Sequence, residues 1–133
     1  MLTDDQFARI LEFRVALRRF GRFSEEQAAK LDMTAAQYQL LLAIRGHDDP
    51  RGPTIADVAR ALLVRHHSAV GLVDRTQDLG LVERHRDSDD LRLVRLTLTP
   101  AGHERVNALA QAHLKELQEL AEVLGALLST SGP

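Results

Sequence analysis

The sequence predicts a single, mainly α-helical domain that contains one two-stranded β-hairpin. Its 133 residues suit one domain. Apolar residues recur at helical spacing in five segments, and only residues 81–99 change to the alternating pattern that is typical of strands. Trp is absent and aromatic residues make up only 4%, so Leu, Val, Ile and Ala must build the core. That composition favours packing of helix on helix.

The first predicted helix covers residues 4–20. It begins with acidic and ends with basic side chains, an order that complements the helix dipole. Its apolar residues form one stripe at helical spacing: Phe7, Ile10, Phe13, Leu17 and Phe20. We expect residues 21–32 to be a connection with room for one helical turn.

Two further helices begin at threonine caps. Thr34 and Gln37 have the spacing of a capping box, which predicts a helix from there to about Arg45. The segment 47–53 contains two prolines and a glycine and should end it. Thr54 is then the N-cap of a short helix whose apolar residues are Ile55, Val58, Ala59 and Leu62.

A fourth helix should follow a break at residues 63–65 and end near Leu79, with Gly80 at the position where a glycine often terminates a helix. One face of this helix is apolar or small: Ala69, Leu72, Val73, Thr76 and Leu79. Residues 81–86 and 91–99 then read as two strands joined by the polar residues 87–90.

The last helix should run from Pro100 to about Leu128. Its apolar positions step by four and three residues, which is a heptad seam: Val106, Ala110, His113, Leu117, Leu120, Leu124 and Leu127. A second stripe adds Leu109, Leu114, Ala121 and Leu128. One small domain cannot bury so wide an apolar surface, so this helix should meet a partner.

The order of these elements predicts a winged helix-turn-helix, with N- and C-terminal helices outside it. The second helix of such a motif enters the major groove of DNA with its N-terminal residues at the base edges. In this sequence those residues are Arg65, His66, His67 and Ser68. The outward face of the same helix continues through Gly71, Asp74, Arg75 and Asp78.

The hairpin carries a more specific pattern, Asp90-x-Arg92-x5-Leu98-Thr99-x-x-Gly102. This pattern resembles the wing signature of the MarR family of winged-helix transcription regulators. Residues 34–44, 68–75 and 80–84 are also similar to segments of that family, and the similarity covers essentially the whole chain in the right order.

The resemblance implies a homodimer in which residues 1–30 and 103–129 form the dimerisation helices and residues 34–99 form a winged DNA-binding lobe. Two lobes would then bind adjacent major grooves of a pseudo-palindromic operator. The wing would enter the minor groove with Arg92 at its tip, braced by Asp90. The resemblance also implies a small-molecule inducer that releases the DNA, and a role as repressor.

These inferences define two sets of candidate site residues. The DNA-binding set is Arg65, His66, His67, Ser68, Gly71, Arg75, Arg84, Arg86, Asp90, Arg92 and Arg95. Within it Arg75, Arg84, Arg86 and Arg95 are expected to bind phosphates, which makes binding sensitive to salt. Gly71 either marks a close approach to a phosphate or is simply tolerated in the helix. The dimer set is Phe7, Ile10, Leu11, Leu117, Leu120, Leu124 and Leu127.

Charge keeps a second hypothesis open, namely a winged-helix interaction or dimerisation module with weak or no DNA binding. The chain has a net charge of −2. Residues 60–95 hold seven arginines against six carboxylates, a balance of only +1. Four of those carboxylates lie on the predicted wing and oppose phosphate contact: Glu83, Asp87, Asp89 and Asp90.

A metal-responsive regulator is a third hypothesis with less support. Neighbours on a helix point about 100° apart, so His66 and His67 cannot easily bind one ion. Residues 47–49 read better as a polar loop than as a metal cluster. His113 lies in the heptad seam, where it is either a partly buried histidine satisfied by a neighbour, or a residue that faces a ligand or responds to pH.

Other classes of protein find no support in the sequence. The absence of cysteine excludes disulfides and thiolate metal sites. There is no signal peptide, no apolar run of the ~20 residues that a membrane span needs, and no catalytic motif. We therefore expect a cytoplasmic protein that has no cofactor, is not an enzyme and has no membrane partner.

Overall fold

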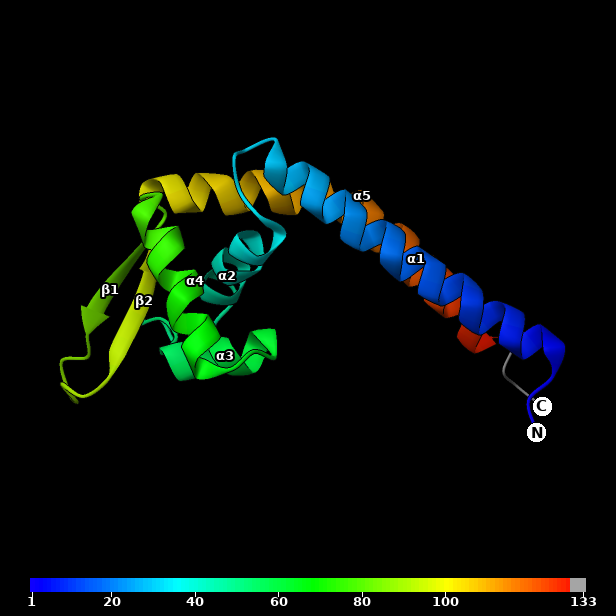
Figure 1. Cartoon of the computed structure of the whole chain (residues 1–133), viewed down its shortest axis with the longest axis horizontal. Coiled ribbons are helices and arrows are strands. Elements are labelled where there is room, and N and C mark those ends of the chain that lie inside the picture. The colour runs from blue at the N-terminus through cyan, green and yellow to red at the C-terminus, as the bar shows by residue number, and fades with distance from the viewer. Residues whose placement is uncertain (130–133) are drawn as a thin grey trace.

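The computed structural model describes residues 1–129, which form five helices and one hairpin. The elements in chain order are α1 (Asp4–Ala29), α2 (Ala35–Arg45), α3 (Ile55–Leu62), α4 (His66–Asp78), β1 (Val82–Arg86), β2 (Val94–Leu98) and α5 (Pro100–Ser129). Figure 1 shows a lobe made of α2, α3, α4, the hairpin and the start of α5, from which α1 and the rest of α5 extend as an arm. The predicted mainly helical, winged fold is confirmed.

Helix α1 is longer than the sequence analysis predicted. The segment expected to be a connection, residues 21–29, continues the helix. Gly21 does not interrupt it, because the stripe that carries Phe20 goes on through Ser24 and Ala28, both of which are buried. The helix ends at Ala29, and Asp32 then turns the chain with a φ of 59°.

Threonine begins four of the five helices. Thr3, Thr34 and Thr54 each form a full capping box, and the boxes at Thr34 and Thr54 confirm the predicted starts of α2 and α3. At α5 the Thr99 hydroxyl accepts the Gly102 N–H at 3.0 Å. Helix α4 differs, because its N-cap is Arg65 and no side chain caps it.

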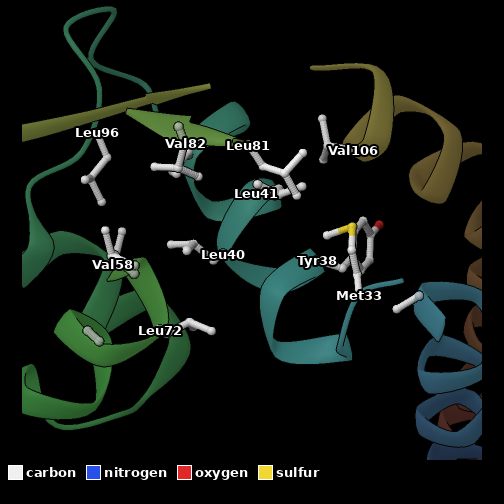
Figure 2. Close-up of a cluster of buried hydrophobic side chains, with 14 of the residues drawn as sticks. Met33, Tyr38, Leu40, Leu41, Val58, Leu72, Leu81, Val82, Leu96 and Val106 are labelled. Carbon is white, nitrogen blue, oxygen red and sulfur yellow. The ribbon is translucent and has the colours of Figure 1, made fainter. Parts of the chain in front are cut away.

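The core of the lobe lies around α2. Figure 2 shows Leu40 and Leu41 of this helix between side chains from α3 and α4 on one side and from the hairpin on the other. Strands β1 and β2 pair antiparallel, and the hairpin contributes Leu81, Val82 and Leu96 to this core. Buried side chains of the described residues therefore join every element of the lobe.

Close contact between backbones fixes α5 against the base of the hairpin. A Cβ added at Gly102 would lie 2.1 Å from the Leu81 carbonyl oxygen, so only glycine fits there. The Thr99 hydroxyl also donates to the Gly80 carbonyl at 2.6 Å. The Leu98-Thr99-x-x-Gly102 part of the hairpin motif thus has a structural role, because Thr99 and Gly102 fix the start of α5 against the hairpin.

The arm, unlike the lobe, leaves apolar side chains open to solvent. Within the described residues nothing before Ser24 and nothing after His113 is buried. The larger exposed apolar side chains of the arm helices are Phe7, Ile10, Leu11, Leu114, Leu117, Leu124 and Leu128. Neither these two helices nor any other within residues 1–129 is long and apolar enough to cross a bilayer.

Candidate nucleic-acid interface

Helices α3 and α4 meet at a tight turn that presents the start of α4 to solvent. Leu63 takes a left-handed conformation with a φ of 55°, and α4 begins three residues later. The predicted base-reading residues are all exposed: Arg65, His66, His67 and Ser68. The opposite face of α4 is buried at Ala69, Leu72, Val73 and Thr76, as predicted, whereas Leu79 is exposed because it lies at the C-cap.

Gly71 and Arg75 lie together on the outward face of α4. A Cβ at Gly71 would approach an Nη atom of Arg75 to 3.2 Å, so the absence of a side chain makes room for this guanidinium. Arg75 itself is exposed. The contact involves the far end of a flexible side chain, so it does not require glycine at position 71.

Two predicted phosphate ligands on β1 have protein partners. Arg84 donates to the Asp74 carboxylate at 2.6 Å and to the Gln77 side chain, and so ties the wing to α4. Arg86 donates to the Leu91 carbonyl at 3.0 Å and spans the tip of the hairpin. Arg86 remains exposed, whereas Arg84 is partly buried.

The wing tip holds the ion pair that the sequence analysis expected. The Asp90 carboxylate accepts from the Arg92 Nε at 3.0 Å, from its Nη2 at 3.0 Å and from its backbone N–H at 3.0 Å. These bonds lower the pKa of Asp90. The Arg92 side chain is nevertheless 89% exposed, so it is oriented by Asp90 and still free to contact DNA.

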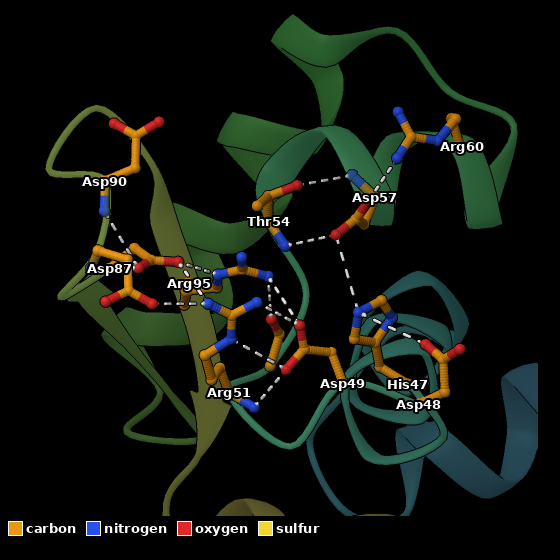
Figure 3. A network of polar contacts seen from close by, with 12 residues as sticks. His47, Asp48, Asp49, Arg51, Thr54, Asp57, Arg60, Asp87, Asp90 and Arg95 are labelled. Carbon is orange, nitrogen blue, oxygen red and sulfur yellow. Dashed lines mark hydrogen bonds and ion pairs between the residues drawn. The ribbon is translucent and has the colours of Figure 1, made fainter.

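Arg95 is largely covered by protein, a position that does not favour the prediction that it binds phosphate. Its side chain is only 12% exposed, and its Nε donates to the Asp87 carboxylate at 2.9 Å. Its Nη1 donates to the Gly52 carbonyl at 3.1 Å. Figure 3 shows the Arg95 side chain between the wing and the loop before α3, next to Asp87 and Asp49.

The wing is less acidic toward solvent than its sequence indicates. Asp87 is 2% exposed, and its pKa is lowered by the backbone N–H of Asp89 and by Arg95. Asp90 is paired with Arg92. Of the four wing carboxylates, only those of Asp89 and Glu83 are therefore mostly exposed to solvent.

A crevice of about 220 Å³ connects the two parts of this surface. It lies between the first residues of α3, the first residue of α4 and the wing, and it is lined by Thr54, Ile55, Ala56, His66, Arg92 and Leu93 among others. Thr54 and Leu93 were not among the residues predicted for this surface, because neither a helix cap nor an apolar strand residue indicates DNA contact in a sequence.

His113 is buried at the junction of arm and lobe. It is 1% exposed; its ring stacks on Tyr38 with centroids 4.8 Å apart and meets the edges of Phe20 and Phe23. Its Nδ1 lies 2.6 Å from the Leu109 carbonyl, so Nδ1 carries the proton, whereas Nε2 has no partner among residues 1–129. The histidine is thus more deeply buried, and less fully satisfied, than the sequence indicated.

A groove of about 500 Å³ runs along the arm between α1 and α5. Its apolar lining includes Leu11, Val15, Phe20, Leu120 and Val123. Of the predicted dimer residues, Leu120 and Leu127 are half-buried, and the others are exposed: Phe7, Ile10, Leu11, Leu117 and Leu124.

The histidines of the lobe do not form a metal site. His47 Nε2 lies 3.9 Å from the Asp48 carboxylate and 3.8 Å from that of Asp57, which also caps α3. Within residues 1–129 no group of three or more His, Cys, Asp or Glu side chains is arranged to hold a metal ion.

Comparison with known proteins relates this geometry to one family. Residues 31–93 match the sequence model described as the MarR family. The transcriptional regulator PecS from Dickeya dadantii is 21% identical over 92 residues, a match that covers 69% of this chain and 55% of PecS. The chain thus spans about half the length of that relative.

Solved structures share the fold over nearly the full chain. A MarR mutant from E. coli, crystallised with operator DNA, is 26% identical, with 90% of each chain covered and a TM-score of 0.71. BpsR from Bordetella bronchiseptica, whose DNA binding is described as regulated by 6-hydroxynicotinic acid, is 23% identical, with 96% of this chain and 99% of BpsR covered and a TM-score of 0.68.

Proposed function

Because residues 31–93 match the MarR family model and the fold is that of MarR from E. coli, we propose that the chain is a homodimeric repressor of this family of winged-helix transcription regulators and binds a pseudo-palindromic DNA operator in the cytoplasm. The observation that carries this proposal is the shared exposure of the α4 start and of Arg92, with one crevice between them. DNA that follows this surface contacts α4 in its major groove and the wing in the adjacent minor groove.

Each part of the interface has a distinct role in this proposal. Residues 65–68 read base edges, and Arg92 enters the minor groove while Asp90 holds its guanidinium. Arg75 and Arg86 are exposed and bind phosphates, and Arg84 contributes only if it exchanges Asp74 for a phosphate. Arg95 has no place in this set.

Dimerisation uses the arm. We assign residues 1–30 and 103–129 to it and residues 34–99 to the DNA-binding lobe. The exposed apolar side chains of α1 and α5 support this assignment, since contiguous apolar surface on a helix pair marks an interface. A second copy would cover this surface and hold two α4 helices at a fixed separation.

Release by a small ligand is the last part of the proposal. It is supported by BpsR, whose DNA binding is described as regulated by 6-hydroxynicotinic acid. A ligand acts on such a protein only if it binds the DNA-competent and the released arrangements of the two lobes with different affinity.

The test is binding to the DNA upstream of the protein's own coding sequence, measured by fluorescence anisotropy in 50 mM salt. Arg92→Ala should weaken binding to all sequences by roughly tenfold or more. His67→Ala should change the preferred sequence if His67 reads a base. Arg22→Ala, an exposed change on α1, is the control and should have no effect.

The same titration decides between the proposal and the interaction module. The module was suggested by the net charge of −2 and by the acidic residues on the wing, and the pairing of Asp87 and Asp90 with arginines weakens only the second argument. Failure of the wild-type protein to bind any duplex in 50 mM salt would nevertheless favour the module.

A further inference from the structure

We propose that Asp87 and Arg95 are positioning residues that hold Arg92 ready for DNA, through an unbroken series of contacts from the body of the lobe to the wing tip. The inference deepens the proposed function and rests on it. It concerns residues that do not reach the DNA themselves.

The series begins where the hairpin meets the loop before α3. The Arg95 Nη1 donates to the Gly52 carbonyl at 3.1 Å, and the neighbouring Leu96 N–H donates to the Pro53 carbonyl at 2.9 Å. Gly52 has a φ of 92° and no room for a Cβ, since one would lie 2.1 Å from the Leu96 carbonyl oxygen. Backbone and side chain of Arg95 are therefore both fixed to the lobe.

Asp87 connects Arg95 to the wing tip, because its two carboxylate oxygens bind different groups. Oδ2 accepts from the Arg95 Nε at 2.9 Å and from Arg51 at 3.5 Å. Oδ1 accepts the backbone N–H groups of Asp89 and Asp90 at 2.8 and 3.3 Å. This buried carboxylate thus ties the turn of the wing tip to an arginine that is itself anchored.

The last step leads from Asp90 to Arg92. With its backbone held by Asp87, Asp90 presents a carboxylate that binds Arg92 by two side-chain bonds and one backbone bond, each 3.0 Å long. An arginine that is already oriented loses less conformational freedom when it binds. Loss of Asp87 or Arg95 should therefore weaken the contribution of Arg92, although both lie away from the DNA.

Asp89 provides a matched control on the same turn. Its side chain is 84% exposed, and among residues 1–129 it forms one ion pair, with Arg51 at 3.5 Å. Asp87→Asn and Asp89→Asn remove the same charge from the same wing. On electrostatic grounds alone, both changes should strengthen binding to DNA. Opposite effects of the two changes would separate positioning from charge.

The experiment measures operator affinity for Asp87→Asn, Asp89→Asn, Arg92→Ala and the double variant Asp87→Asn/Arg92→Ala in the full-length protein. We expect Asp89→Asn to bind as tightly as the wild type or more tightly, and Asp87→Asn to bind roughly tenfold more weakly. In the Arg92→Ala background, Asp87→Asn should cause no further loss of affinity. An equal loss in both backgrounds would overturn the proposal.

A second measurement needs no DNA and so separates this inference from the proposed function. In the free protein, ¹⁵N relaxation of the Arg92 Nε–H group should show increased motion in Asp87→Asn and in Arg95→Met, but not in Asp89→Asn. An Arg92 side chain that stays equally ordered in all three would refute the positioning role. If the wild type binds no duplex, the proposed function fails, while the relaxation data still decide this point.

Discussion

The lobe and the arm use similar apolar residues but bury them to very different extents. Leu40, Leu41 and Leu96 in the lobe are completely buried, whereas Leu11, Leu114 and Leu128 on the arm are more than half exposed. The lobe therefore has a core of its own. The arm presents apolar surface that a core normally covers, and under the proposed function a second copy of the chain covers it.

The largest effect is expected when charged side chains replace apolar ones on the exposed apolar surface of the arm. Leu117→Asp with Leu124→Asp should weaken dimerisation by about 1000-fold or more, because a symmetric dimer buries each charge twice and loses the burial of each leucine. Sedimentation velocity over a concentration series measures this. Lys115→Asp on the exposed face of α5 is the control. A double variant that stays dimeric at the wild-type concentration would show that the interface lies elsewhere.

The second test removes volume from the core of the lobe. Leu40→Ala should lower the free energy of unfolding by about 2–5 kcal/mol, because Leu40 is fully buried and its loss leaves a cavity. Leu11→Ala should leave the unfolding of the lobe nearly unchanged and affect dimerisation instead. Urea unfolding at one fixed protein concentration compares the two. Equal losses would mean that lobe and arm unfold as one unit.

The third test uses the carboxylates of the lobe in acid. The folded protein lowers the pKa of Asp49, Asp87 and Asp90, chiefly through Arg51, the Asp89 N–H and Arg92 respectively. Their stabilising contribution is present above the unfolded pKa of about 4 and is lost as the pH falls through the folded values.

The free energy of unfolding should therefore decline below about pH 4. For the Asp87→Asn variant this decline should be less steep than for the wild type. Urea unfolding at pH 5, 4 and 3 gives the slopes, with Asp89→Asn as the control. A slope that Asp87→Asn leaves unchanged would show that this carboxylate gains nothing from its partners.

The smallest effect is expected at the junction of lobe and arm. His113→Leu removes the unpartnered Nε2, whose burial costs about 1–3 kcal/mol, but it also removes the bond to Leu109 and the aromatic contacts. The two changes offset each other, so the free energy of unfolding should change by less than about 1 kcal/mol. A large loss would mean that the ring contacts dominate.

The same variant tests whether His113 makes operator binding sensitive to pH. Operator affinity is compared at pH 6 and pH 8 for the wild type, His113→Leu and His103→Leu, an exposed change on the same helix. If His113→Leu responds to pH in the same way as the wild type, the hypothesis of a pH-sensing histidine is wrong.

Most elements of the fold could be predicted because they depend on local signals. The threonine caps, Gly80 and the alternation in β2 each act within a few residues, and the structure confirms the elements that they predict. The end of α1 could not be placed in this way. Gly21 is a local signal against helix, and packing of Ala28 in the core overrides it.

The candidate site shows where strand alternation stops being informative. Alternation along β2 places Arg95 on the face opposite Leu96, and that face was predicted to be exposed to solvent. In the structure the loop with Asp49 and Gly52 covers it, so Arg95 faces protein while Arg92, three residues earlier, faces solvent. Only the tertiary arrangement distinguishes these two arginines.

The arginine at the start of α4 also bears on the engineering of a more stable variant. Four helices begin with a threonine whose hydroxyl accepts a backbone N–H, and α4 alone begins with a residue that cannot do so. Replacing Arg65 by Thr should add about 1 kcal/mol of stability. Under the proposed function it would also remove a cation from the DNA-facing surface, so thermal stability and operator affinity compete at this position.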